Sequence, residues 1–327
     1  MEERLRQILS AALHYSVTDI HFSRNTITDT VTIDMRVHGV MKRLKADESD
    51  LALFRYLMYQ ANLDISNAFL PQTGSFEMMI GKMHLSLRFA VVNSYHITSG
   101  VLRILNNHPE LKIEELSAQE DASAWLANIT NHKNGLFLLS GPTSSGKTTS
   151  LYTILNHAAN KKIFTLEDPI EIQNDSFVQL QINESQHLSY AEGIKQLMRH
   201  DPDLLMIGEI RDEEAAQMAV RCALTGHLVL SSIHSTDCAT AIIRMRDLGV
   251  KEYELKDVLY GISNQRLFEK EDGSRIGVYE IMEREEVLYY LEHRQPSRSF
   301  RNLRNRIQEN IDKGVISEES AREELLQ

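Results

Sequence analysis

Cysteine, long apolar runs and an excess of basic residues are all scarce or missing in this chain of 327 residues. The two cysteines, Cys222 and Cys238, form no metal-type pair, which indicates reduced, structural thiols. Because no run of about 20 apolar residues is present, no transmembrane helix is predicted. The N-terminus, MEERLRQILS, is typical of an amphipathic helix and not of a signal peptide. A cytoplasmic location is therefore expected.

The charge balance is acidic, with 35 basic and 46 acidic side chains and a formal net charge of −11. Such a chain is not expected to hold nucleic acid over a broad electrostatic surface, although local basic patches stay open. The length suits two domains followed by an extension.

The most informative segment is GPTSSGKTT, residues 141–149, which matches the P-loop pattern of glycine, four residues and then Gly-Lys-Ser/Thr. Gly141 and Gly146 allow the backbone amides to close on phosphate oxygens. Lys147 is expected to be a solvated charge that reaches the β- and γ-phosphates, and the Thr148 hydroxyl is expected to bind Mg²⁺. The predicted nucleotide-binding residues are Gly141, Pro142, Thr143, Ser144, Ser145, Gly146, Lys147, Thr148 and Thr149.

The surroundings of this segment favour the same interpretation. The apolar run GLFLLS, residues 135–140, is typical of a buried parallel strand, and SLYTILNHAAN after the loop predicts a helix. Strand, loop and helix is the order that a P-loop requires.

The rest of the chain predicts an α/β protein with two kinds of sheet. In the first hundred residues, apolar alternation predicts antiparallel strands, including a pair that turns at Gly81-Lys82, and a helix is expected from about Asp47 to Asn62. Further on, apolar strands alternate with helical stretches, as in a mostly parallel sheet; they centre near Leu136, Ile163, Leu204 and Leu228. A turn at Asp272-Gly273 predicts a hairpin beyond that sheet, and a charged helical segment follows.

These patterns divide the chain into four predicted parts. Residues 1–105 form an N-terminal α+β domain, and the polar segment 106–116, which contains Pro109, is the linker. Residues 117–265 form the P-loop core, and residues 266–327 form a C-terminal hairpin and helical extension.

Three later segments supply candidates for the chemistry of phosphoryl transfer. Glu167 ends one predicted strand, Glu209 and Arg211 end another, and His227 and His234 stand at opposite ends of a third. Taken singly, an acidic strand end is more often a solvated loop or helix cap, and a histidine there is more often structural. However, ligands gather at the carboxyl ends of parallel strands, where Glu167, Glu209 and His234 all fall.

These motifs resemble the Walker A, Asp box, Walker B and His box of the secretion ATPase superfamily, specifically the type II secretion and type IV pilus assembly ATPases. The resemblance implies a PAS-like N-terminal domain and a RecA-like P-loop ATPase domain with a helical C-terminal extension. It implies ATP and Mg²⁺ as ligands, Glu209 as the catalytic Walker B carboxylate, Glu167 as an Asp-box residue near Mg²⁺, directly or through water, and His234 near the γ-phosphate. It also implies nucleotide-reaching arginines in the N-terminal domain, for which Arg88 and Arg103 are the candidates.

One departure from the family pattern concerns zinc. Many relatives carry a tetracysteine zinc module after the QRL element, but the residues from Leu267 to Val278 contain no cysteine, so a four-thiolate zinc site is excluded there. The chain also lacks a long additional N-terminal domain, and it shows no helix signature of pilus retraction ATPases. As a short chain without the zinc module that retains QRL and GVYEIM, the protein is similar to the ATPase of the Gram-positive competence pseudopilus.

The resemblance implies a cytoplasmic homo-hexameric motor that hydrolyses ATP to assemble a type IV pilus or competence pseudopilus for DNA uptake. It would act at the cytoplasmic face of the inner or plasma membrane through an inner-membrane platform protein, without direct nucleic-acid binding. Three alternatives stay open: a type II secretion pseudopilus ATPase, a nucleic-acid-translocating secretion ATPase, and a poorly catalytic scaffold that uses nucleotide as a switch.

Overall fold

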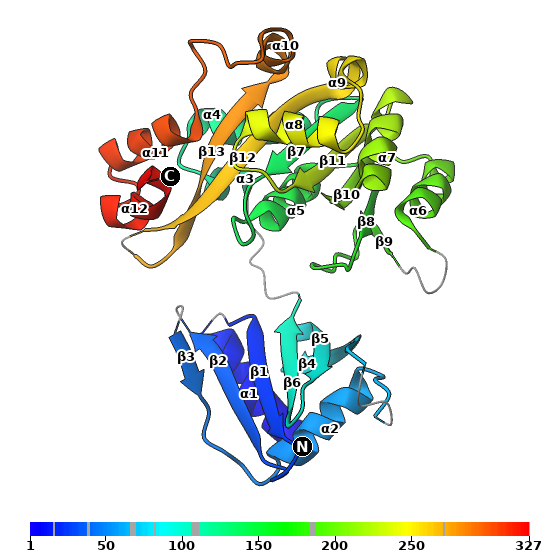
Figure 1. The fold of residues 1–327 in the computed structure, drawn as a ribbon, viewed down its shortest axis with the longest axis vertical. Coiled ribbons are helices and arrows are strands. Elements are labelled where there is room, and N and C mark those ends of the chain that lie inside the picture. Colours follow the sequence, from blue (N-terminus) through cyan, green and yellow to red (C-terminus); the bar gives the residue numbers. More distant parts are fainter. Residues whose placement is uncertain are drawn as a thin grey trace. The chain divides into compact units, whose positions relative to one another are not determined.

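The computed structural model describes residues 1–15, 17–37, 40–65, 70–81, 83–105, 111–182, 188–270 and 272–326. The chain divides into two units (Figure 1). Unit 1 comprises residues 1–109 and the short stretch Glu171–Gln173, and unit 2 comprises residues 110–170 and 174–327. The predicted linker, 106–116, lies partly outside the described residues, and its described part includes helix α3 (Ile113–Leu116).

Unit 1 is a six-stranded antiparallel sheet covered on one face by two helices. The helices are α1 (Glu2–His14) and α2 (Asp50–Gln60). In sheet order, the strands are β3 (Val40–Arg43), β2 (Val31–Val37), β1 (Asp19–Asn25), β6 (Ile97–Ile104), β5 (Met83–Asn93) and β4 (Gln72–Ile80). The predicted α+β arrangement and the helix expected near residues 47–62 are confirmed.

Alternation of apolar and polar side chains explains why the helices cover one face of this sheet. Every second residue of β2, β5 and β6 is buried, and these side chains meet the apolar stripes of α1 and α2. Three aromatic rings, Phe22, Phe54 and Phe89, pack edge-on or tilted at the centre, with centroids 5.6 to 6.3 Å apart. Gly81, with φ of +60°, occupies the predicted β4–β5 turn; Lys82 lies outside the described residues.

Unit 2 is a seven-stranded sheet in which β7, the strand that leads into the P-loop, lies between β12 and β11. In sheet order, the strands are β13 (Arg275–Glu283), β12 (Leu259–Glu269), β7 (Gly135–Ser140), β11 (Leu228–Ile233), β10 (Leu204–Ile210), β8 (Ile163–Glu167) and β9 (Val178–Gln181). All neighbours are parallel except β12 and β13. This is the RecA-like P-loop arrangement that the sequence predicts.

Helices cover both faces of the parallel sheet (Figure 1). On one face lie α6 (Tyr190–Leu197), α7 (Glu213–Leu224), α8 (Cys238–Asp247), α9 (Glu252–Val258) and α10 (Arg284–His293). On the other, α5 (Lys147–His157) contacts β7 and β11 and packs against α3 and α4 (Glu120–Ile129). The single tryptophan, Trp125 of α4, stacks edge-on to Phe137 of β7 at 6.0 Å. A short 3-10 helix, η2 (Met198–His200), follows α6.

The predicted position of the hairpin was wrong. The hairpin at Asp272-Gly273 does not lie beyond the sheet, because its first strand, β12, pairs in parallel with β7 and is buried along most of its length. The last helices, α11 (Leu303–Asp312) and α12 (Glu318–Leu326), pack their apolar side chains on the hairpin, around Phe268 and Val278. The predicted division at residue 265 falls inside β12.

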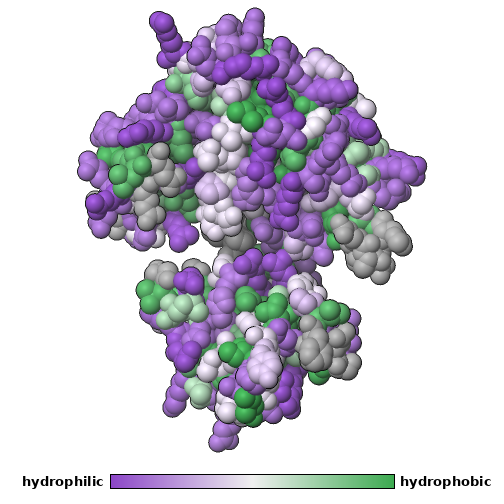
Figure 2. Space-filling model, viewed as in Figure 1, coloured by the Kyte–Doolittle hydropathy of each residue, from purple (hydrophilic) through white to green (hydrophobic). Residues whose placement is uncertain are grey.

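In the view of Figure 2, hydrophilic residues predominate on the surface of each unit, and hydrophobic ones are interspersed among them. Among the described residues, no helix combines the length and hydropathy needed to span a membrane.

Candidate active site

The P-loop joins β7 to α5 and has backbone angles that require glycine at two positions. Gly141 has φ of +144° and Gly146 has φ of +88°, a region that side chains disfavour. A Cβ on Gly141 would lie 2.7 Å from the carbonyl oxygen of Gln265, in β12. The loop therefore has a curved backbone of the kind that surrounds phosphate, seated directly on β12.

Lys147, at the first turn of α5, is buried, with 8% of its surface exposed. Its ammonium donates to the carbonyl oxygens of Gly141 at 3.0 Å and Pro142 at 2.8 Å. The expectation of a solvated lysine with little structural role was wrong, because the side chain also closes the loop on itself.

His234 connects the P-loop to the predicted Walker B carboxylate. It follows β11 directly, and its Nδ1 lies 3.1 Å from the carbonyl oxygen of Gly141, while its Nε2 lies 2.8 Å from Oε1 of Glu209. Both partners present oxygen atoms to the ring, so the imidazole bridges the P-loop and the carboxylate. Lys147 and His234 thus meet at the carbonyl oxygen of Gly141, and His234 links it to Glu209.

Glu209 also contacts Arg211, which the sequence places two residues further on. The guanidinium donates to Oε2 of Glu209 at 2.7 Å, and this interaction raises the pKa of Arg211. The carboxylate therefore has a cationic or donor group on each oxygen, with 16% of the side chain exposed.

Glu167 ends β8 and is 4% exposed. Its Oε1 accepts hydrogen bonds from Thr165 at 2.6 Å and from the hydroxyl of Tyr152, in α5, at 2.8 Å, and Gln179 of β9 donates to it at 3.3 Å. Sequence reasoning missed Tyr152 and Gln179, because no local pattern marks a partner on another element. These donors hold the carboxylate in one orientation at the carboxyl end of the sheet.

Binding of Mg²⁺ by Thr148 and Glu167 stays a prediction. The resemblance implies the Thr148 hydroxyl on α5 and the Glu167 carboxylate, directly or through water, as its protein ligands, and oxygen ligands are the ones that Mg²⁺ prefers. Among the described residues, no three histidine, cysteine or acidic side chains cluster closely enough to hold a metal by themselves. A Mg²⁺ ion at a P-loop takes its remaining ligands from nucleotide phosphates and water.

The candidate arginines lie side by side in unit 1. Arg88 of β5 and Arg103 of β6 are directly opposite each other in the antiparallel register, and Arg103 pairs with Asp19 of β1 at 2.6 Å. Burial, followed by the charge of Arg103, lowers the pKa of Arg88. Their action on nucleotide stays a prediction.

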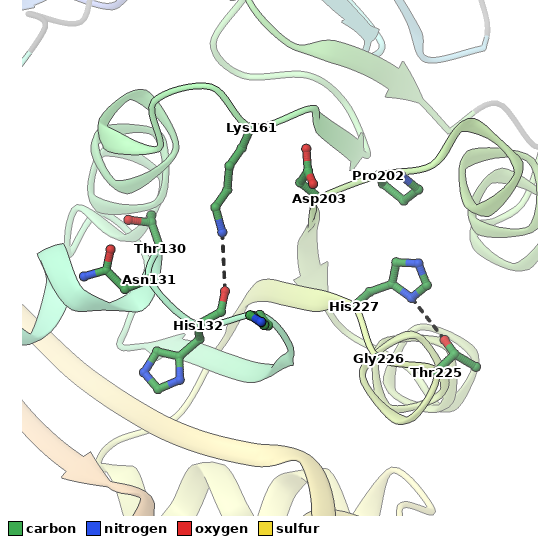
Figure 3. Close-up of a pocket in the computed structure, with 10 residues that line it drawn as sticks. Thr130, Asn131, His132, Lys161, Pro202, Asp203, Thr225, Gly226 and His227 are labelled. Carbon is green, nitrogen blue, oxygen red and sulfur yellow. Dashed lines mark hydrogen bonds between the residues drawn. The ribbon is translucent and has the colours of Figure 1, made fainter.

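His227 lies away from the P-loop, at the opposite edge of the sheet. It directly precedes β11 and lines a pocket of about 570 Å³ formed by the segments that lead into β7, β8, β10 and β11 (Figure 3). There Thr225 contacts Nδ1 of His227 at 3.2 Å, and Lys161 donates to the carbonyl oxygen of His132 at 3.3 Å. Burial, together with Lys161, lowers the pKa of His132. His227 is therefore not part of the predicted nucleotide site.

The fold and this arrangement define unit 2 as a RecA-like P-loop unit. A family model described as type II/IV secretion system protein matches residues 1–322, and the chain belongs to this family.

Two curated relatives illustrate its range. The chain is 37% identical over 268 residues to a protein of Escherichia coli K12 described as a putative type II secretion system protein E; the match covers 80% of this chain but 54% of that one. It is 34% identical over 276 residues to the competence protein ComGA of Bacillus subtilis, and this match covers 82% of this chain and 76% of that one. The fold is similar to that of the Legionella pneumophila ATPase DotB, with a TM-score of 0.75 and 20% identity; the match covers 98% of this chain and 95% of that one.

Proposed function

We propose that this protein binds ATP with Mg²⁺ at the P-loop and hydrolyses it as the motor of a pilus or pseudopilus assembly system. The observation that carries the proposal is the connected set Lys147, Gly141, His234 and Glu209, which joins the phosphate-binding loop to a carboxylate by contacts of 2.8 to 3.1 Å. A phosphate loop, a cation and a carboxylate at one sheet edge are the parts that nucleotide hydrolysis needs.

Each residue has a role that follows from its chemistry. The P-loop amides and Lys147 bind the phosphates, and nucleotide would draw the ammonium from the carbonyl oxygens of Gly141 and Pro142 toward phosphate oxygens. Glu209 orients the attacking water and accepts its proton. His234 lies beside the P-loop, where it would interact with the transferring phosphoryl group.

Thr148 and Glu167 are the residues that would hold Mg²⁺, Glu167 directly or through a water. When bound, the ion neutralises charge on the β- and γ-phosphates. Tyr152 and Thr165 fix the orientation of the Glu167 carboxylate by donating hydrogen bonds to it.

The biological role follows from the family. The names of the type II secretion and competence relatives support a role in such a system. From the family resemblance we infer that the chain forms a hexamer in the cytoplasm, which would act on an inner-membrane platform protein without binding nucleic acid itself. Arg88 and Arg103 would contact nucleotide in the closed state of the hexamer, so that binding energy is converted into domain movement. The 37% identity to a type II secretion protein favours a secretion pseudopilus as the second candidate.

The test is Mg²⁺-dependent phosphate release by the wild type and by Lys147→Met, which keeps the apolar stem of the side chain and removes the charge. We expect the variant to lose ATP binding and turnover while circular dichroism stays unchanged. Lys133→Ala, at an exposed lysine near the opposite sheet edge, is the control and should hydrolyse ATP normally. Near-normal turnover by a folded Lys147→Met protein would refute the proposal.

The same preparations test the remaining parts of the proposal. Native mass spectrometry should find a hexamer, and turnover should not respond to added DNA. Metal analysis should find no stoichiometric zinc. Strong stimulation by DNA would favour a nucleic-acid-translocating ATPase instead.

A further inference from the structure

Three consecutive polar residues of β12, Asn264, Gln265 and Arg266, are buried, with exposures of 0%, 1% and 8%. We call them the β12 polar segment. Asn264 pairs in register with Ser140, the last residue of β7 before the P-loop. Because buried polar groups are costly without hydrogen bonds, the partners of this segment indicate its role.

Gln265 contacts the P-loop through both its side chain and its backbone. Its side-chain Nε2 donates to the backbone carbonyl oxygen of Ser145 at 2.6 Å. The backbone carbonyl oxygen of Gln265 occupies the space that a Cβ on Gly141 would need. Gln265 thus contacts both ends of the loop between Gly141 and Gly146.

Asn264 and Arg266 hold the loop that follows His234. The amide of Asn264 donates to the carbonyl oxygen of Ser235 at 3.1 Å, and Nη2 of Arg266 donates to that of Thr236 at 3.1 Å. A third bond, from Nη1 of Arg266 to Oδ1 of Asn264 at 2.7 Å, joins the two side chains. The two residues after His234 are therefore both fixed by β12.

The other side of Arg266 faces the C-terminal helix α12. Its Nε donates to Oε1 of Glu324 at 2.8 Å, and the arginine side chain is 9% exposed while that of Glu324 is 26% exposed. The remaining acceptors of Arg266 are neutral oxygens, and within the described ranges Glu324 is its one carboxylate partner. Without that carboxylate, a nearly buried guanidinium would lack a counter-charge and be drawn toward solvent.

We propose that Arg266 is a positioning residue for the His234 loop and that α12, through Glu324, keeps Arg266 in place, so that docking of α12 sets the rate of hydrolysis. The inference rests on the proposed ATPase function. Neither Arg266 nor Glu324 needs to contact nucleotide. Release of Glu324 frees the guanidinium, the carbonyl group of Thr236 loses its donor, and His234 moves away from Gly141 and Glu209.

The decisive variant is Glu324→Gln, which keeps the side-chain shape and removes the charge. Its matched control is Glu319→Gln, at an exposed position of the same helix. We expect kcat to fall about 10-fold in Glu324→Gln, with the affinity for a non-hydrolysable ATP analogue within about twofold of the wild type. Amide hydrogen exchange in residues 235–238 should become faster in this variant and stay unchanged in the control.

A second variant, Arg266→Lys, keeps the charge but cannot offer the planar set of donors. It should also lower kcat more than affinity and speed exchange in residues 235–238. Wild-type kcat and exchange in Glu324→Gln would overturn the proposal, and so would a parallel fall of kcat, affinity and melting temperature, which indicates a merely structural contact. If the wild type does not hydrolyse ATP, the proposed function fails, whereas the exchange measurement still tests the coupling of α12 to the His234 loop.

Discussion

Replacing Glu209 by glutamine removes the negative charge from the centre of the candidate site with little change of shape. One oxygen of Glu209 accepts from Arg211 at 2.7 Å and the other faces Nε2 of His234 at 2.8 Å. A glutamine can present its oxygen to only one of these two partners, and its NH₂ group faces the other as a second donor. The variant therefore loses one contact as well as the basic group.

The expected loss of activity far exceeds the expected loss of stability. General-base catalysis contributes about 10²–10⁴-fold, which corresponds to roughly 2.7–5.4 kcal/mol of activation free energy. Pairs near the surface contribute about 0–1 kcal/mol to folding, and the pair of Glu209 with Arg211 includes an arginine that is 62% exposed. We therefore expect kcat to fall at least about 100-fold, while the free energy of unfolding changes by about 1 kcal/mol or less.

The assay compares single-turnover phosphate release, ATP affinity and thermal unfolding of Glu209→Gln with those of the wild type. Glu213→Gln, an exposed carboxylate at the start of α7, is the control and should behave as the wild type does. ATP should stay bound to Glu209→Gln, because the P-loop is intact. Equal losses of affinity and turnover would refute the reasoning and make Glu209 a structural carboxylate.

Arg88→Ala and Arg103→Ala should each lower turnover more than ATP affinity, since a guanidinium that meets phosphate in the closed state stabilises developing charge. Unchanged turnover with a lower melting temperature would instead assign these arginines to ion pairs such as that of Arg103 with Asp19. Burial raises the pKa of Cys222 to about 12 and that of Cys238 well above its ordinary value, so a thiol reagent at pH 8 should label the native protein far more slowly than the protein in denaturant. Gly100→Ala should destabilise unit 1 by about 1–3 kcal/mol, because the added Cβ would lie 2.6 Å from the ring of Phe89. Chemical unfolding followed by circular dichroism measures this, and a stability equal to that of the wild type would show that the Phe89 ring moves freely aside.

The sequence predicts the elements with strong local patterns. GLFLLS and the glycine pattern of the P-loop are local signals, and the shared edge of Glu167, Glu209 and His234 follows from the geometry of parallel strands. The contact of His234 with Gly141 joins residues 93 positions apart. The shared strand ends predict that these two residues lie near each other, but not that they form a hydrogen bond.

The role of β12 could not be predicted from local pattern. The turn at Asp272-Gly273 predicts a hairpin beyond the sheet, and the division predicted at residue 265 separates Arg266 from the P-loop core. Asn264 pairs with Ser140 of β7, whereas Gln265 contacts the P-loop and Arg266 contacts the loop after His234. The carboxylate partner of Arg266 lies 58 positions further on, in α12. The burial of Lys147 was missed for the same reason, because its acceptors are backbone carbonyl oxygens, which side-chain types do not encode.

The single tryptophan gives the protein a built-in optical reporter. Trp125 lies in unit 2, where its ring packs against Phe137 of β7 and against the backbone of Gly261 in β12. Tryptophan fluorescence, excited selectively at the indole, therefore reports unfolding of unit 2 alone, whereas circular dichroism reports unfolding of the whole chain. A difference between the two melting curves would measure how far the two units unfold as one cooperative body.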